Sequence, residues 1–242
     1  MTVIRQEDLI ESIADALQFI SYYHPLDFIR AMRGAWEKEE SPSAKAALTQ
    51  VLVNSRMCAI GKRPICQDTG IVNVFISVGM DVSWEADMSL EDMINEGVRR
   101  GYTHPENVLR GSVLEDPDGA RANTKDNTPA VIHPRIVPGD KIEIEVAAKG
   151  GGSEAKAKFA MLNPSDSVAD WVLSVVPTMG AGWCPPGLLG VGIGGTPEKA
   201  MLLAKQSLMD PLDMHELLER GPGNHLEELR IELYEKVNGL GI

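Results

Sequence analysis

Cysteine and aromatic residues are scarce in this chain of 242 residues. It contains three cysteines, and phenylalanine, tryptophan and tyrosine together make up 5% of the sequence. So small and odd a number of cysteines argues against a disulfide framework of the kind that stabilises small secreted domains. Each thiol must therefore be explained by itself, either as a buried structural side chain or as a reactive or ligating group.

Long hydrophobic runs and an excess of positive charge are also missing. No run approaches about eighteen apolar residues, and the first residues lack the basic segment and apolar core of a secretory signal. The formal net charge of −12 argues against nonspecific binding to nucleic acid or to anionic membranes. A local positive pocket for an anionic substrate is still compatible with that charge. We expect a cytoplasmic protein that binds neither nucleic acid nor membrane.

The hydrophobic content of 43% and the charged content of 24% are those of an ordinary globular domain. Residues 1–60 repeat apolar side chains at helical spacing, whereas residues 72–78 alternate in the manner of a strand. The change of period predicts a mixed α/β (α+β) fold. We expect a helical lead-in over residues 1–60 and an α/β region over residues 61–242 that forms one domain with it.

Turn and capping residues place the remaining elements. Ser43 is expected to cap the third helix of the lead-in, with Val51 facing inward, and Ser89 with Asp92 predicts the start of a helix that ends at Gly101. Further on, the sequence predicts a hairpin of residues 130–137 and 141–148 around Pro138-Gly-Asp140, a strand over residues 156–162, and helices that follow Ser165, Thr196 and residue 225.

Two of the three cysteines lie in unusual surroundings. Cys66 is part of Ile65-Cys-Gln-Asp-Thr-Gly70, and Cys184 is part of Gly182-Trp-Cys-Pro-Pro-Gly187, whereas Cys58 lies within a predicted helix and is interpreted as a buried thiol. Structural zinc sites bring cysteines in close pairs, which this chain lacks, and no histidine lies in an obvious motif as a base for a nucleophilic thiol. Well-separated loop cysteines favour an iron–sulfur cluster. We predict that Cys66 and Cys184 hold one cluster.

Two glycine-rich segments need separate interpretations. Lys149-Gly-Gly-Gly-Ser153 indicates close backbone approach or positive φ angles. Gly190-Val-Gly-Ile-Gly-Gly195 matches the dinucleotide pattern, but the strand before it would be very short and Asp210 lies at a helix end, so that reading is disfavoured. A helix that begins behind a glycine-rich turn also suits other anions, including carboxylates.

Five motifs together resemble those of class I fumarate hydratases, which are similar to the α subunit of L(+)-tartrate dehydratase. In order they are Cys66-Gln-Asp-Thr-Gly, the loop Asn123-Thr-Lys-Asp-Asn-Thr-Pro129, Lys149-Gly-Gly-Gly-Ser, Cys184-Pro-Pro and Gly194-Gly-Thr-Pro-Glu. The resemblance implies a hydro-lyase of the tricarboxylic acid cycle that interconverts fumarate and L-malate. It also implies a [4Fe–4S] cluster held by three cysteines, with one iron left open as a Lewis acid.

The resemblance assigns roles to individual residues of this chain. It implies a small dicarboxylate substrate and a cluster bound by Cys66 and Cys184. Gln67 and the catalytic Asp68 would contact the substrate or iron-bound water, and Arg110 would bind a substrate carboxylate. The backbone at Gly150 and Gly151 would pack against the substrate. On the residues alone, Asp68 has an alternative interpretation as a loop carboxylate that caps Gly70, and the loop from residue 123 to 129 as a solvated loop.

Members of that family continue beyond a segment like Gly239-Leu-Gly-Ile242 to a third ligand cysteine and a second domain that carries the base. Neither is present in the sequence, so we expect the N-terminal part of a longer enzyme, or a subunit. The chain would form a homodimer, or a hetero-oligomer with a separate C-terminal-type subunit, and would not hold a stable cluster alone. Two alternatives stay open: an L(+)-tartrate dehydratase α-type subunit, and a noncatalytic cytoplasmic binding domain that reuses the fold.

Overall fold

The computed structural model describes residues 2–241 and divides the chain into two compact units. Unit 1 comprises Met1–Pro25 and Trp36–Gly151, and unit 2 comprises Leu26–Ala35 and Gly152–Ile242. Helices and strands occur together, so the predicted mixed α/β class is confirmed. The predicted boundary between a lead-in over residues 1–60 and a region over residues 61–242 stays a prediction.

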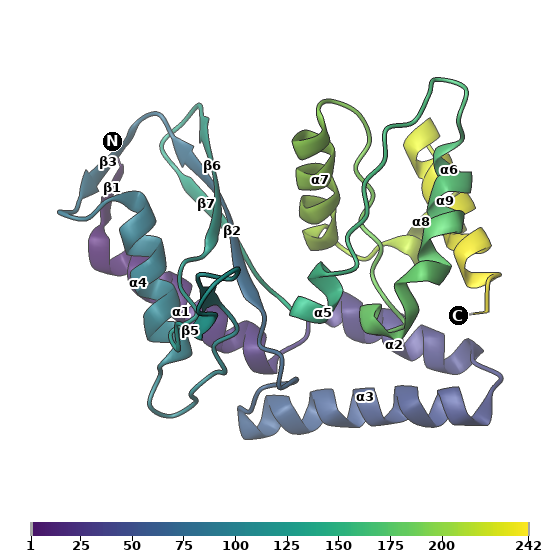
Figure 1. Ribbon diagram of the computed structural model, residues 1–242, viewed down its shortest axis with the longest axis horizontal. Helices are drawn as coiled ribbons and strands as arrows, with labels where there is room; N and C mark the ends of the chain where they lie inside the picture. The colour runs from purple at the N-terminus through teal and green to yellow at the C-terminus, as the bar shows by residue number, and fades with distance from the viewer. Residues whose placement is uncertain (1, 242) are drawn as a thin grey trace. The chain divides into compact units, whose positions relative to one another are not determined.

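Unit 1 is built on a three-stranded sheet with the order β6-β2-β7 (Figure 1). The central strand β2 (Ile71–Gly79) pairs in parallel with β6 (Val131–Val137) and antiparallel with β7 (Ile142–Lys149). The expected hairpin of the last two strands is therefore wrong, because they pair with opposite edges of β2 and not with each other. Seven of the nine residues of β2 are buried, whereas no residue of either edge strand is. The most apolar strand takes the central position because both its edges and its core face are then covered.

Helices α1 (Gln6–Tyr22) and α4 (Leu90–Tyr102) cover one face of this sheet (Figure 1). The two helices approach closely at Gly97, where a Cβ atom would lie 2.8 Å from the carbonyl oxygen of Ile10. Ser89 caps α4 by accepting a hydrogen bond from the backbone N–H of Asp92, as predicted. The core face of β2 contributes its alternate residues Val72, Val74, Ile76 and Val78.

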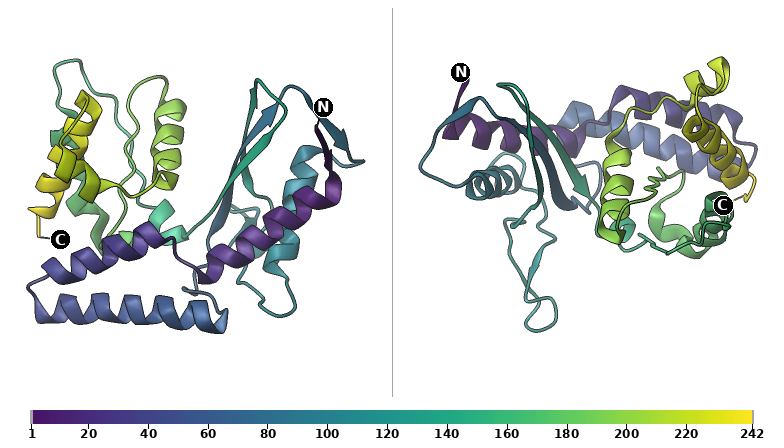
Figure 2. Two further views of the ribbon diagram at one scale, coloured as in Figure 1. Left: turned by 180° about the vertical axis from the view of Figure 1, so that it is seen from behind. Right: turned by 90° about the horizontal axis from the view of Figure 1, so that it is seen from above.

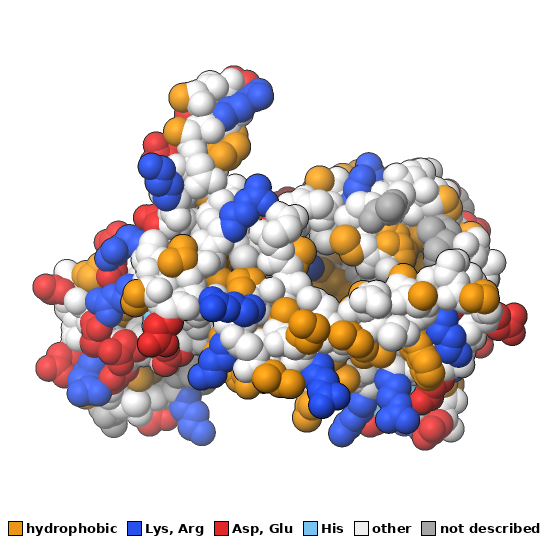
Figure 3. Space-filling view, turned by 90° about the horizontal axis from the view of Figure 1, so that it is seen from below, with side chains coloured by type: hydrophobic (Ala, Val, Ile, Leu, Met, Phe, Trp, Pro, Cys, Tyr) orange, Lys and Arg blue, Asp and Glu red, His pale blue; other side chains and the backbone are white. Residues whose placement is uncertain are grey.

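The N-terminal part of unit 1 departs from an all-helical lead-in. Strand β1 (Thr2–Arg5) pairs in parallel with β3 (Val82–Glu85), and neither strand was predicted. The long helix α3 (Pro42–Gly61) is capped by Ser41 and not by Ser43. The inward position predicted for Val51 is also wrong, since its side chain is 40% exposed. Helix α3 contains no acidic residue, and hydrophobic side chains intermingle with Lys and Arg on the face that carries it (Figure 3).

Between α4 and β6 the chain of unit 1 forms a long loop. Its short strands β4 (Leu114–Glu115) and β5 (Ala122–Asn123) pair antiparallel, and the segment that carries them projects from the rest of the unit (Figure 2). The bend back toward the sheet contains a cis peptide bond between Thr128 and Pro129. The loop therefore returns the chain to the start of β6, beside the start of β2.

Unit 2 is helical in its described residues. Its core is formed by Ala169, Val172, Val176 and Leu233. The strand expected over residues 156–162 is wrong: this segment pairs with no described strand, and Met161 is 76% exposed. Unit 2 shares helix α2 (Leu26–Lys38) with unit 1. Helix α6 (Val168–Val175) is capped by Ser167 and not by Ser165. The other helical elements are α5 (Gly151–Glu154), the 3-10 segments Val176–Trp183 and Ser207–Met209, α7 (Pro197–Gln206), α8 (Met214–Arg220) and α9 (His225–Asn238).

None of the helices within residues 2–241 combines the length and the apolar character that crossing a bilayer requires.

Candidate functional site

The segment from Cys66 to Gly70 forms the loop that leads into β2, as the sequence predicts. Gly70 has a φ of +83°, and a Cβ atom there would lie 2.6 Å from the carbonyl carbon of Ala148 and 2.7 Å from the nitrogen of Lys149. Only glycine fits this backbone angle against the end of β7. The loop therefore packs closely against the end of the sheet at which β2 begins and β7 ends.

A buried tyrosine of α4 holds the loop by hydrogen bonds to its backbone. The Tyr102 hydroxyl is shared between the carbonyl oxygens of Thr69, at 2.6 Å, and Gly70, at 3.1 Å. Burial, with a contribution from the negative charge of Asp68, raises the pKa of Tyr102 to about 12. The phenol thus stays protonated at neutral pH and acts as the hydrogen-bond donor.

Asn127 ties the same loop to the long loop that follows α4. Its side chain is fully buried, and Nδ2 donates to the carbonyl oxygen of Gly70 at 2.9 Å. Oδ1 accepts from the backbone N–H groups of Ser112, at 2.6 Å, and Val113, at 3.2 Å. The loop from residue 123 to 129 belongs to the motifs of the resemblance, with a solvated loop as the alternative on its polar composition, and neither reading gave Asn127 a role. The available signal was the residue type, since asparagine is among the few that tolerate the left-handed conformation, here with a φ of +64°.

Two of the predicted substrate-contacting side chains, Gln67 and Arg110, are in direct contact beside this loop, and Asp68 follows Gln67 in the chain. The Arg110 guanidinium donates a hydrogen bond to Oε1 of Gln67, and the Thr69 hydroxyl donates to the carbonyl oxygen of Arg110. The Asp68 carboxylate lies against Gly150, where an added Cβ atom would be 3.0 Å from Oδ2. Unit 1 thus brings a carboxamide, a carboxylate and a guanidinium together at one end of the sheet.

The predicted glycines differ in their surroundings. Gly150 faces Asp68, whereas Gly151 begins α5 and no described atom lies within 4 Å of the position that its Cβ would take. A side chain is therefore restricted at the first glycine and tolerated at the second.

The three thiols fall into two classes. Cys58 is buried in α3, as predicted, with its sulfur 3.6 Å from Oδ1 of Asn54 and 3.5 Å from the carbonyl oxygen of Pro64. Cys66 and Cys184 are exposed. Cys66 belongs to unit 1, where its Sγ accepts from the backbone N–H of Asp68 at 3.5 Å. Cys184 belongs to unit 2 and has a φ of +57°, which a residue with a side chain adopts at a cost of about 1–2 kcal/mol.

The two exposed thiols are suited to binding iron, because a ligand must be reachable by the metal. They do not make a complete set. Within residues 2–241, no three histidine, cysteine or acidic side chains gather in a geometry that could hold a metal ion.

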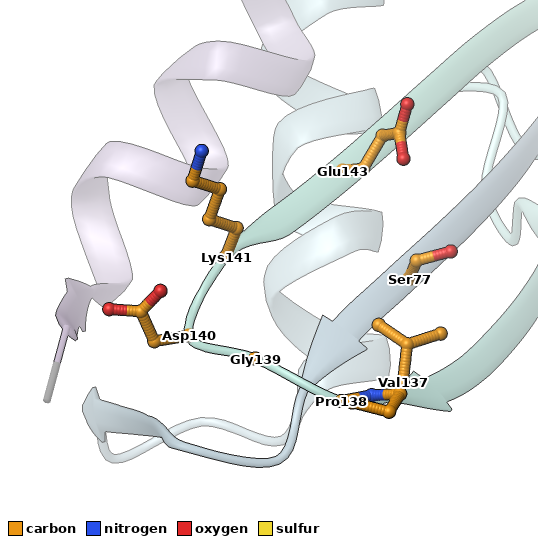
Figure 4. A pocket seen from close by; sticks show the side chains of 7 residues that line it. All are labelled: Ser77, Val137, Pro138, Gly139, Asp140, Lys141 and Glu143. Carbon is orange, nitrogen blue, oxygen red and sulfur yellow. The ribbon is translucent and has the colours of Figure 1, made fainter.

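A hollow of about 260 Å³ lies at the other end of the sheet (Figure 4). It is at the C-terminal end of β2, whereas the Cys66–Gly70 loop precedes the N-terminal end of that strand. Strands rise about 3.3 Å per residue, so the two places are separated by roughly 25 Å. The charged side chains in Figure 4 diverge from one another, and the hollow is not part of the candidate site. Its lining residues are Ser77, Val137, Pro138, Gly139, Asp140, Lys141 and Glu143.

Comparison with known proteins identifies relatives over almost the whole chain. The sequence profile of the family described as fumarate hydratase (Fumerase) matches residues 10–242. A Methanocaldococcus jannaschii protein provisionally named L(+)-tartrate dehydratase subunit alpha is 32% identical over 237 residues, which cover 95% of this chain and 80% of its own. The L(+)-tartrate dehydratase subunits alpha of Escherichia coli (strain K12) and Shigella sonnei (strain Ss046) are each 28% identical over 239 residues, which cover 97% of this chain and 76% of theirs.

Proposed function

Because the chain belongs to the fumarate hydratase (Fumerase) family, a family of hydro-lyases, we propose that it is the cluster-binding part of an iron–sulfur enzyme that interconverts fumarate and L-malate. The resemblance inferred from the five sequence motifs is thereby confirmed. The observation that carries the proposal is the contact of Arg110 with Gln67 on a loop that also carries Asp68 and the exposed Cys66 and that is fixed by buried residues.

Cys66 and Cys184 are the proposed ligands of a [4Fe–4S] cluster, because they are the two exposed thiols. When bound, such a cluster with one open iron supplies a Lewis acid for the hydroxyl group that leaves. Cys58 is a poor ligand since its thiol is buried and faces two protein oxygens. The N–H of Asp68 that points at Cys66 Sγ is the kind of backbone donor that supports a cluster sulfur.

The side chains of unit 1 have separate roles in the proposed reaction. Arg110 binds a substrate carboxylate through its planar guanidinium, and Gln67 holds that guanidinium in orientation. Asp68 exchanges a proton with the hydroxyl group that departs as water. The absence of a side chain at Gly150 lets the Asp68 carboxylate lie against the backbone there, and the backbone at Gly150 and Gly151 is proposed to pack against the substrate.

The names of the relatives favour a second candidate within the same reaction class. Those reported above are named L(+)-tartrate dehydratase alpha subunits, provisionally in the case of the Methanocaldococcus jannaschii protein. As the alternative, this chain is an α-type subunit that dehydrates L(+)-tartrate together with a separate subunit. Both candidates take a small dicarboxylate with a hydroxyl group, and both use the same loop. A homodimer is the assembly expected for the first candidate and a hetero-oligomer for the second.

Anaerobic reconstitution with iron and sulfide tests both the ligands and the reaction. It is performed on the chain alone and on the chain with a candidate second subunit, and bound iron and the visible absorbance of the cluster are measured. We expect Cys66→Ser and Cys184→Ser to lose iron and the matched control Cys58→Ser to retain it. Retention of wild-type iron by both of the first two variants would contradict the ligand assignment.

Turnover then separates the candidate functions. The form that retains iron is supplied with L-malate, fumarate and L(+)-tartrate, and the preferred substrate decides between the two enzymes. Asp68→Asn is expected to abolish turnover while leaving bound iron unchanged, because Asp68 is not a proposed ligand. Absence of turnover with all three substrates in an iron-loaded wild-type protein would favour a noncatalytic binding domain.

A further inference from the structure

We propose that Asn127 is a positioning residue of the candidate site. Its side chain holds the Cys66–Gly70 loop and the loop that carries Arg110 in a fixed position relative to each other. The inference rests on the proposed function for the roles of Arg110 and Asp68. The contacts of the Asn127 side chain lie entirely within unit 1.

The Asn127 side chain joins two separate segments through its two ends. Its amide nitrogen holds the carbonyl oxygen of Gly70, and its amide oxygen holds the N–H groups of Ser112 and Val113. These partners also fix the orientation of the amide, because the nitrogen must face the carbonyl oxygen and the oxygen must face the two N–H groups. The side chain is 0% exposed, so water does not replace a lost contact without a rearrangement.

Other residue types would lose part of this arrangement. Aspartate keeps the acceptor for the two N–H groups but places a second oxygen against the carbonyl of Gly70. Alanine supplies neither the hydrogen-bond donor nor the acceptor, and it is strained at a φ of +64°. Glycine accepts that backbone angle but supplies no hydrogen bond. Asparagine meets the demands of the backbone and of both loops.

The two loops that Asn127 joins carry the proposed substrate-binding groups. Gly70 lies two residues after Asp68, and Ser112 lies two residues after Arg110. A second link is the hydrogen bond from Thr69 to the carbonyl oxygen of Arg110, and a third is the contact between the Gln67 and Arg110 side chains. Asn127 makes the deepest of the three links, since the other two hydrogen bonds lie at exposed positions. Without it, the two loops can hinge about the contact of Thr69.

A hinge of this kind displaces the Arg110 guanidinium relative to Asp68 and Gly150. Misplacement of a binding group by about 1 Å can lower a catalytic rate about 100-fold. We expect kcat/KM for the dicarboxylate substrate to fall about 10-fold to 100-fold in Asn127→Asp, with most of the change in KM, because Arg110 is a carboxylate-binding group. Bound iron is expected to stay unchanged.

The direct test measures local order in the full chain without added iron. Asn127→Asp and Asn127→Gly are compared with the wild type, and Asn238→Asp, on the exposed end of α9, is the matched control. Nuclear magnetic resonance follows the side-chain Nε–H of Arg110 and the amides of Ser112 and Val113. The first variant should shift the Arg110 signal and keep the two amides hydrogen-bonded, whereas the second should perturb all three signals.

The results distinguish positioning from a role in stability alone. If Asn127 only supports the fold, both variants unfold at lower denaturant concentration but keep the wild-type Arg110 signal while folded, and that outcome overturns the proposal. Unchanged KM and kcat in an active iron-loaded enzyme would overturn it as well. If the wild-type enzyme turns over no dicarboxylate, the proposed function fails, but the Arg110 signal still decides the role of Asn127. The glycine variant keeps the test decisive if the buried carboxylate prevents folding.

Discussion

Replacement of Tyr102 by phenylalanine tests how the Cys66–Gly70 loop is supported. The change removes a single oxygen and leaves a ring that is 0% exposed in the core. Gly70 keeps a hydrogen bond from Asn127, but the Thr69 carbonyl loses the hydroxyl that lies 2.6 Å away. A lost hydrogen bond that leaves a buried acceptor unpaired costs about 1–3 kcal/mol. We expect the free energy of unfolding at pH 7 to fall by about 1–2 kcal/mol, since Thr69 itself is partly exposed.

The same variant should remove a dependence of stability on high pH. The pKa of Tyr102 is raised to about 12 in the folded chain, whereas that of an unfolded tyrosine is about 10. Between these values the unfolded chain loses the phenolic proton and the folded chain keeps it, so stability falls as pH rises. The contribution of this tyrosine is complete below pH 10 and decreases by about 1.4 kcal/mol per pH unit through the window.

Urea unfolding followed by circular dichroism at several pH values provides the measurement. The wild type should be more stable than Tyr102→Phe at pH 7, and the difference should shrink from about pH 10 onward and vanish or reverse near pH 12. Tyr23→Phe, at a partly exposed position of unit 1, is the control and should follow the wild type. A difference between wild type and Tyr102→Phe that stays constant from pH 9 to pH 12 would refute the reasoning.

Two comparisons between glycines give further predictions. Gly150→Ala should lower turnover of the iron-loaded enzyme by displacing Asp68, whose Oδ2 would lie 3.0 Å from the new Cβ, and it should lower turnover more than Gly151→Ala, whose Cβ displaces no protein group among the described residues; steady-state kinetics of both variants check this. Equal rates for the two would remove Gly150 from the site. Gly97→Ala should destabilise the packing of α4 on α1 by about 1–3 kcal/mol, because the new Cβ meets backbone at 2.8 Å. Gly34→Ala, in an open helical position, should be neutral or stabilising by up to about 1 kcal/mol, and chemical denaturation of both proteins measures the difference.

Local patterns were sufficient for the elements that position the site. The alternation after Gly70 predicted β2, and Ser89 with Asp92 predicted the start of α4. These features depend on residues within a few positions of one another, so the sequence displays them directly. The motif of Cys66 was therefore correctly placed in the loop that leads into a strand.

Partners distant in the sequence could not be predicted in the same way. Residues 130–137 and 141–148 look like a hairpin, because the turn between them is short and both are strand-like, yet each pairs with β2. Residues 156–162 carry a strand pattern but have no described strand to pair with, and a strand without a partner does not form. Asn127 escaped notice for a related reason, since its importance comes from Gly70, 57 residues earlier.

The support of the Cys66–Gly70 loop also determines when that loop can become ordered as the chain is made. Its anchors come later in the sequence: Tyr102 is 32 residues beyond Gly70, Asn127 is 57 residues beyond, and the end of β7 follows both. Contacts of such separation form after local helices because the loop-closure entropy must first be overcome. During synthesis, Cys66 therefore leaves the ribosome as an unplaced thiol, and its loop acquires a fixed conformation only once β7 has joined the sheet. Under the proposed assignment of Cys66 as a cluster ligand, iron would be acquired only after completion of the sheet of unit 1.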